Sequence, residues 1–207
     1  MLRFEAVVHN TRALRCGRVL ENFPRIIARL AGMVDRFTTT LDCVDVTFIG
    51  DDLLDRLPTP AQVGATRVGG LDLNKPRIRA ALAAVLALSV TADGFTVADF
   101  TTKVHTMTGQ TRYSVRQAAY DLRKLRGKDL ITKPGRSRRY HLEPQTAGTI
   151  AALLALREHV LEPILAGVRS PRMGRKPATW TNVDRDYEKI RIDMQTLFHD
   201  LGIRAAG

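Results

Sequence analysis

The order of short elements in residues 77–142 constrains the fold of this chain more than any other feature of its sequence. Alanine and leucine fill residues 77–88, which are therefore expected to form a helix. A second helix should begin after Thr96, because Thr96 and Asp99 have the spacing of a capping box, in which each side chain accepts a hydrogen bond from a backbone amide. That helix should end near Gly109.

The rest of the segment adds a third helix and a hairpin. We expect the helix over residues 112–126, because Gly127 follows it at the cap position where a left-handed backbone favours glycine. Two short strands, residues 130–133 and 139–142, then flank a tip at residues 134–138 that contains proline, glycine and two arginines. The expected order is helix, helix, turn, helix, strand, basic tip, strand.

The third helix is expected to have two different faces. At about 100° per residue, one side gathers apolar positions, namely Val115, Ala118, Ala119 and Leu122. The opposite side gathers Tyr113, Gln117, Tyr120 and Lys124. This second group is flanked by Arg112, Arg116 and Arg123. One face should therefore pack on the core, while the other remains exposed to a partner.

Positive charge is concentrated in the same region. The whole chain has a formal net charge of +11 and a pI near 10.3. Between residues 112 and 139, the only acids are Asp121 and Asp129, and the cations are Arg112, Arg116, Arg123, Lys124, Arg126, Lys128, Lys133, Arg136, Arg138 and Arg139. An ordinary solvated helix face mixes both signs. The imbalance indicates a polyanionic partner, either nucleic acid or an acidic membrane surface.

The segment resembles the winged helix-turn-helix family and, within it, the multiple-antibiotic-resistance-type regulators. The resemblance rests on the helix over 96–109, on the helix over 112–127 with the ending Leu-Arg-Lys-Leu-Arg-Gly-Lys-Asp-Leu-Ile at residues 122–131, and on the basic return strand at 136–140. It covers about a third of the chain. Together with residues 2–5, the same stretch is similar to the C-terminal part of uncharacterised proteins associated with mobile elements.

The resemblance implies binding of double-stranded DNA, by a transcription regulator or by the DNA-recognition component of a mobile element. In this motif the third helix enters the major groove, where arginine bonds guanine and glutamine bonds adenine. Base contacts are expected from Arg112, Ser114, Arg116 and Gln117, with Tyr113 left open between bases and backbone. Phosphate contacts are expected from Tyr120, Arg123 and Lys124. The wing should supply minor-groove or phosphate contacts from Arg136, Arg138 and Arg139.

Residues 1–57 are expected to form a small strand-helix-strand domain. Apolar residues alternate over 2–8 and again over 44–48, which is typical of strands with one buried face. Between these segments, apolar residues recur every three or four positions over 23–41, which predicts a helix. A short helix over 52–57 should follow.

The other divisions complete a fold of the α+β class. Proline and glycine predict an irregular linker over 58–76, before the winged segment at 77–145. An apolar packing helix over 146–168 follows, and then a basic linker over 169–180 that faintly resembles an AT-hook. The chain is expected to close with a helix over 181–202.

The last helix has a heptad seam, because its apolar residues are spaced four, three, four, three and four positions apart. These residues are Val183, Tyr187, Ile190, Met194, Leu197 and Leu201. Docking on the same chain and pairing with a second chain both remain open from the spacing. The family resemblance implies a homodimer formed through the C-terminal helices.

An enzyme is the main alternative, although no motif confirms it. Glu5, Asp45 and Asp51 could meet around Mg²⁺, as in a metal-dependent nuclease or recombinase. The histidines have no metal-ligand spacing, and neither a phosphate-binding loop nor a nucleophile elbow is present. We therefore expect no catalytic residue, metal or cofactor. A winged module that binds RNA or another protein is the third hypothesis.

Composition favours a globular protein of the cytoplasm, associated with the nucleoid. Hydrophobic residues make up 44% of the chain and charged residues 26%, which excludes a disordered chain. Cys16 and Cys43 have no metal-ligand spacing, which fits a reducing compartment. The sequence has no apolar run of about 18 residues, the length that a membrane span needs, so no membrane span is expected, and nucleic acid rather than a membrane is the predicted partner.

Overall fold

The computed structural model describes residues 5–9, 14, 16, 19–45, 49–50, 52–109, 111–162 and 179–200. The chain divides into two compact units, residues 1–154 and 155–207. Helices predominate in the described residues, together with a two-stranded antiparallel sheet. The predicted α+β class is therefore confirmed. None of the described helices is long and apolar enough to cross a membrane.

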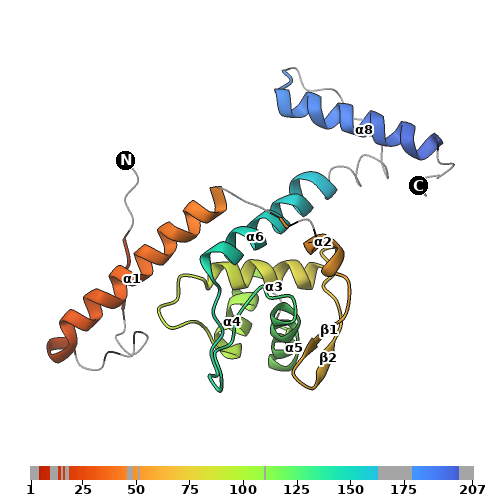
Figure 1. Cartoon of the computed structure of the whole chain (residues 1–207). Coiled ribbons are helices and arrows are strands. Elements are labelled where there is room, and N and C mark those ends of the chain that lie inside the picture. The colour runs from red at the N-terminus through yellow and green to blue at the C-terminus, as the bar shows by residue number, and fades with distance from the viewer. Residues whose placement is uncertain are drawn as a thin grey trace. The chain divides into compact units, whose positions relative to one another are not determined.

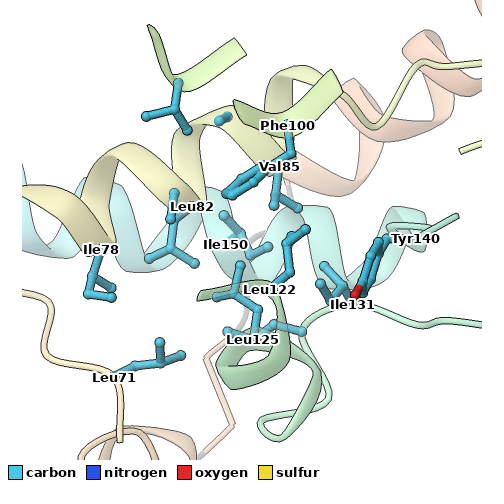
Figure 2. Packing of buried hydrophobic residues seen from close by; sticks show 14 of the residues in the cluster. Leu71, Ile78, Leu82, Val85, Phe100, Leu122, Leu125, Ile131, Tyr140 and Ile150 are labelled. Carbon is cyan, nitrogen blue, oxygen red and sulfur yellow. The ribbon is translucent and has the colours of Figure 1, made fainter. Parts of the chain in front are cut away.

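Three helices form the centre of the first unit (Figure 1). They are α3 (Pro76–Ala87), α4 (Val97–Thr108) and α5 (Val115–Arg126). Their inner faces enclose a core to which each helix contributes at least one fully buried large side chain (Figure 2), for example Leu82, Phe100 and Leu122. Full burial of each such side chain stabilises the fold by about 1.5–3 kcal/mol, so these contacts fix the position of α5.

The boundaries of α4 follow the sequence prediction, and α5 ends at Arg126 as predicted but with a different cap conformation. Asp99 N donates to Thr96 Oγ1 at 3.2 Å, and Thr96 N donates to Asp99 Oδ2 at 2.8 Å, which confirms the capping box. Gly109 ends α4 with a φ of 67°, in the left-handed region that favours glycine. The left-handed cap predicted at Gly127 is wrong, because its φ is −68° and the positive φ falls on Asp129 instead.

A hairpin follows α5 and is held to the connection between α3 and α4. Thr132 and His141 exchange backbone hydrogen bonds of 2.9 Å, and Tyr140 exchanges two with Phe95 at 2.8 and 3.0 Å. The strands predicted on either side of the tip are thus reduced to isolated bridges. Gly94 permits this close approach, because its φ is +69° and a Cβ there would lie 2.3 Å from the carbonyl oxygen of Tyr140.

Residues 58–76 are folded, which corrects the prediction of an irregular linker. They contain an antiparallel hairpin of β1 (Ala61–Val63) and β2 (Thr66–Val68). Each strand ends in a buried valine, and a Cβ on Gly127 would touch both valines. The hairpin therefore packs against the end of α5. Strands of three residues are too short to produce a recognisable alternation, which explains why the sequence did not reveal them.

The N-terminal region of the first unit contains one long helix, α1 (Val19–Asp45), with a non-helical backbone at Asn22. It confirms the helix predicted over 23–41 and extends it at both ends. The short helix α2 (Leu53–Arg56) lies within the predicted range of 52–57.

The two strands predicted beside this helix are wrong wherever the structure describes them. Residues 5–8 form no strand, and Val44 lies in α1. The alternation that begins at Val44 also continues the three- and four-residue spacing of the helix, and the helical period prevails there. Residues 1–4 and 46–48 lie outside the described residues.

The helix predicted over 146–168 begins earlier, as α6 (Pro144–Ala155), and continues as the π-helical segment η1 (Leu156–Leu161). Ile150 and Leu153 are fully buried in the core of the first unit, which matches the expectation that this helix packs. The second unit contains η1 and α8 (Asn182–Asp200). Residues 163–178, which include most of the basic linker, lie outside the described residues.

Candidate nucleic-acid interface

The segment expected to read DNA begins with a turn and then a capped helix. Ser114 is the N-cap of α5: Gln117 N donates to its Oγ at 3.2 Å, and Ser114 N donates to Gln117 Oε1 at 2.8 Å. Such a cap is typically worth about 1 kcal/mol. The predicted helix start at Arg112 is therefore wrong, because this second capping box was not recognised. Ser114 and Gln117 are exposed, but each already bonds the other, and their base contacts stay a prediction.

The packed face of α5 is rotated relative to the prediction. Ala118 and Leu122 are buried, as expected, but Val115 is 58% exposed and the buried face also includes Asp121. The prediction chose the buried face from the spacing of apolar residues. It therefore included Val115 and left out Asp121, because acids are rarely buried without a partner. The rotation brings Arg116 and Arg123 to the centre of the exposed face.

Three arginines project from this exposed side. Arg116 and Arg123 are seven residues apart, which is about two helical turns, so both leave α5 in the same direction. Arg112 is exposed in the turn before the helix. Hydrogen bonds or ion pairs to any of the three are absent among the described residues. All three keep their full capacity to bond an external acceptor.

The position of Tyr113 contradicts the prediction that it contacts bases or backbone. Its side chain is 6% exposed, and its hydroxyl donates to Asp121 Oδ2 at 2.9 Å. Arg77 Nη2, at the start of α3, lies 3.2 Å from Asp121 Oδ1, and His105 Nε2 lies 2.7 Å from the carbonyl oxygen of Tyr113. Tyr113 therefore anchors the turn that presents Arg112.

Burial controls the ionisation of this network. Desolvation raises the pKa of the Asp121 carboxyl, while the Tyr113 hydrogen bond and the charges of Arg77 and Lys124 oppose the rise. Desolvation also raises the pKa of the Tyr113 hydroxyl, and the Asp121 charge adds to that effect. Tyr113 thus remains a neutral hydrogen-bond donor that ties the turn to α5. The sequence signal for this network was the single acid on a helix otherwise rich in arginine.

Tyr120 and Lys124 lie on the side of α5 nearest the β1–β2 hairpin. Lys124 Nζ donates to the carbonyl oxygen of Gly70 at 2.9 Å and lies 5.2 Å from the centre of the Tyr120 ring. The Tyr120 hydroxyl accepts a hydrogen bond of 3.4 Å from Gly69 N, and the residue is 39% exposed. Both predicted phosphate ligands are therefore partly engaged within the protein.

The tip of the hairpin after α5 carries two exposed arginines, Arg136 and Arg138. Neither has a hydrogen bond or ion pair with another residue in the described part of the chain. Arg139 differs from them: it is half-buried, and its Nη1 donates to the carbonyl oxygen of Gly94 at 2.7 Å. Arg139 therefore holds the hairpin to the α3–α4 connection, a structural role that the sequence did not indicate.

One cation of the basic segment is buried. Lys128 is 5% exposed, and its ammonium donates to the carbonyl oxygens of Arg56 and Thr59, the latter at 2.7 Å. Desolvation lowers the pKa of Lys128, and the charge of Arg56 lowers it further. The count of cations in the sequence thus overstates the charge that a partner can meet.

The described residues contain no group of three or more His, Cys, Asp or Glu side chains that could hold a metal ion. Asp45 is the last residue of α1 and Glu5 lies outside any strand, while Asp51 is not among the described residues. The paired strands on which the nuclease hypothesis relied are thus missing from the described parts of 2–8 and 44–48.

Comparisons of the chain with protein-family models, curated protein sequences and solved structures find no match.

Proposed function

We propose that the protein binds double-stranded DNA, with α3, α4, α5 and the hairpin after α5 acting as a winged helix-turn-helix. One observation carries the proposal: exposed arginines without a described partner gather on α5, on the turn before it and on the hairpin tip. They are Arg112, Arg116, Arg123, Arg136 and Arg138. The only acid of α5, Asp121, is buried, so the exposed face of this helix carries no charge that repels phosphate.

The proposed contacts follow from the position of each arginine. Arg112 and Arg116 lie at the N-terminal end of α5, the end that usually reaches base edges in this motif. Arg123 lies two turns further along and is assigned to phosphate. The hairpin arginines are assigned to phosphate or the minor groove. Arginine suits each place, because its planar guanidinium forms paired hydrogen bonds with guanine or with phosphate.

In this proposal the protein serves as a transcription regulator or as the DNA-recognition component of a mobile element. Either role requires sequence preference, so the first experiment selects bound fragments from random duplex DNA. The second compares Arg116→Ala with Arg25→Ala, which removes an equal charge from an exposed position of α1. Binding is measured by fluorescence anisotropy on the selected duplex and on a scrambled one.

Arg116→Ala should weaken binding to the selected duplex by about tenfold or more and change binding to the scrambled duplex much less. Arg25→Ala should leave the preference between the two duplexes unchanged. Equal losses on both duplexes in Arg116→Ala would contradict base reading by Arg116. Tighter binding to structured RNA than to any selected duplex would contradict the proposal itself.

A further inference from the structure

The β1–β2 hairpin lies over the C-terminal end of the α5 surface that carries the exposed arginines. Arg116, Tyr120 and Arg123 are spaced four and three positions apart, so they form one stripe along the exposed side of α5. Gly127, four residues further on, continues the stripe, because its φ of −68° and ψ of −10° keep the helical direction. A Cβ there would lie 2.9 Å from Val63 Cγ2. The hairpin therefore rises from α5 on the same side as the arginines.

The hairpin has an inner face and an outer face. Its register pairs Gln62 with Arg67, and the neighbouring residues of both strands point to the opposite face. That face holds Val63 and Val68, which are buried and lie against Gly127. Gln62 and Arg67 therefore lie on the outer face, and both are exposed. Because the hairpin covers the end of the stripe, its outer face is directed away from α5, as the arginines of the stripe are.

Arg67 gives this outer face a positive charge. It is the one charged residue between positions 58 and 71. Within the described part of the chain, no hydrogen bond or ion pair engages its guanidinium. Its cross-strand neighbour Gln62 already donates from Nε2 to a carbonyl oxygen of the turn at 2.9 Å. The acid that follows α5, Asp129, pairs with Arg56 at 3.3 Å. The hairpin thus offers a cation and contains no acid that would repel phosphate.

The two hairpins of the first unit flank α5. In Figure 1 the β1–β2 hairpin and the hairpin after α5 lie on opposite sides of this helix. The first contacts the end of α5 at Gly127, and the second is bonded through Tyr140 to Phe95 in the α3–α4 connection. A helix in the major groove has a phosphate backbone on each side of it. The two hairpins are therefore placed to contact one backbone each.

The C-terminal end of α5 is the end that leaves the bases. The helix contains 12 residues, so it is about 18 Å long, whereas the major groove is about 12 Å wide. Because the N-terminal end is assigned to base edges, the C-terminal end lies nearer the sugar-phosphate backbone. Arg67 stands at this end, beyond Arg123. Its expected acceptor is therefore a phosphate, which a guanidinium binds through paired hydrogen bonds.

We infer that the β1–β2 hairpin is a second wing, which binds the phosphate backbone of duplex DNA through Arg67 at the C-terminal end of α5. The inference rests on the proposed function and adds a contact on the side of α5 that the hairpin after α5 does not cover. A phosphate contact positions a protein on the duplex and carries no sequence information directly. Loss of Arg67 should therefore weaken binding to every duplex alike, unlike loss of Arg116.

The first test is the affinity for the selected and the scrambled duplex at several salt concentrations. Arg67→Ala should weaken binding to both by about threefold or more and reduce the slope of log affinity against log salt by about one. Arg67→Lys should keep the slope, because it keeps the charge. Arg25→Ala, which removes an exposed cation from α1, is the matched control and should also keep it. An Arg67→Ala variant with the slope of wild type would overturn the inference.

The second test locates the contact on the duplex. Phosphates of the selected duplex are replaced one at a time by neutral methylphosphonates, and the affinity for each modified duplex is measured. Wild type should lose affinity at phosphates on both sides of the bases that Arg116 reads. Arg67→Ala should become insensitive to a replacement on one side, and Arg136→Ala to a replacement on the other. Sensitivity of Arg67→Ala that equals wild type at every phosphate, or mapping of both arginines to the same side, would contradict a second wing.

Failure of the second wing is distinguishable from failure of the proposed function. Urea denaturation first checks that Arg67→Ala is as stable as wild type, as expected for an exposed side chain without a described partner. If wild type prefers the selected duplex, Arg116→Ala loses that preference and Arg67→Ala binds like wild type, only the second wing is overturned. If wild type binds no duplex, both are overturned.

Discussion

Helices α5 and α8 begin in the same way, and their outward faces differ. Each starts with a capping box, Ser114 with Gln117 in α5 and Thr181 with Asp184 in α8. Beyond the cap, α5 buries one face in a core and exposes arginines on the other. By contrast, α8 exposes an apolar seam that is flanked on one side by acids. Caps therefore set where a helix starts, and the residues on its open face decide which partner it can meet.

The two helices also differ in how much of their apolar surface is buried by other helices. The inner face of α5 is buried by α3, α4 and α6 within the same unit, as Figure 2 shows for Leu122, Leu125 and Ile150. The seam of α8 has no comparable cover among the described residues. The fold of the first unit should therefore depend strongly on α5 and little on α8.

The largest effect is expected from Leu122→Ala. Leu122 has no exposed surface, so the truncation should lower the free energy of unfolding by about 2–5 kcal/mol. The same change at Leu197, which is 48% exposed, should lower the stability of the first unit by less than about 1 kcal/mol. Urea denaturation followed by circular dichroism measures both. Similar losses for the two leucines would mean that α8 belongs to the core.

The next effect concerns salt. Arg123→Ala should weaken binding to duplex DNA and reduce the slope of log affinity against log salt by about one, because one phosphate contact is lost. Lys189→Ala removes an exposed cation from α8 and should leave that slope unchanged. Titrations at several salt concentrations provide the slopes. An unchanged slope in Arg123→Ala would remove this residue from the interface.

The caps should produce a smaller and local effect. Ser114→Ala should cost about 1 kcal/mol in the free energy of unfolding, because α5 loses half of its capping box. Thr181→Ala should loosen the start of α8 and leave the first unit unaffected. Trp180 is the only tryptophan of the chain and precedes this cap, so its fluorescence reports the change in α8. A loss of first-unit stability in Thr181→Ala would show that the two regions are coupled.

The smallest effect is the pH dependence of Asp121. Because burial raises its pKa in the folded protein, Asp121 contributes stability that is fully present below its ordinary value of 3.8 and is lost as pH rises through the folded value. Asp121→Asn keeps an acceptor for the Tyr113 hydroxyl and lacks this titration. The unfolding free energy of wild type minus that of Asp121→Asn should therefore fall as the pH rises from about 3 into the mildly acidic range.

Asp186→Asn, the same substitution on the exposed surface of α8, is the control variant for this pH series. If the unfolding free energy of wild type minus that of Asp121→Asn instead grows as the pH rises, the ion pair with Arg77 outweighs the cost of burying the carboxylate, which would contradict this prediction.

Sequence analysis correctly located the elements whose formation depends on residues that are close together in the sequence. Periodicity located α1 and α6, and the Thr96 and Asp99 pair located the start of α4, because a cap and a helical period are both local. The strands expected over 2–8 and 44–48 were wrong because a short alternation is weak evidence beside a continuing helix. The β1–β2 hairpin was missed because its packing on Gly127 joins segments that are distant in sequence.

The candidate site was predictable only in part, for a similar reason. Local sequence pattern is enough to predict that Arg112, Arg116, Arg136 and Arg138 are exposed. For four other residues of the basic segment, contacts with other parts of the fold decide whether the side chain is buried or bonded within the protein. Those residues are Tyr113, Lys124, Lys128 and Arg139, whose partners lie on α5, the β1–β2 hairpin, the α2 region and the α3–α4 connection. The number of cations in the sequence does not distinguish Lys124, Lys128 and Arg139, which bond the protein itself, from the exposed arginines.

The central claim is that the arginines of α5, of the turn before it and of the hairpin tip bind duplex DNA, and that the exposed cations of α1 and α8 do not. It is tested most directly with two triple variants of equal charge, Arg112, Arg116 and Arg123 to alanine, and Arg25, Arg185 and Lys189 to alanine. Affinity for the selected duplex is measured by fluorescence anisotropy. The account predicts a loss of about a hundredfold or more for the first variant, from about 1 kcal/mol or more per contact, and little change for the second. Equal losses in the two variants would contradict it.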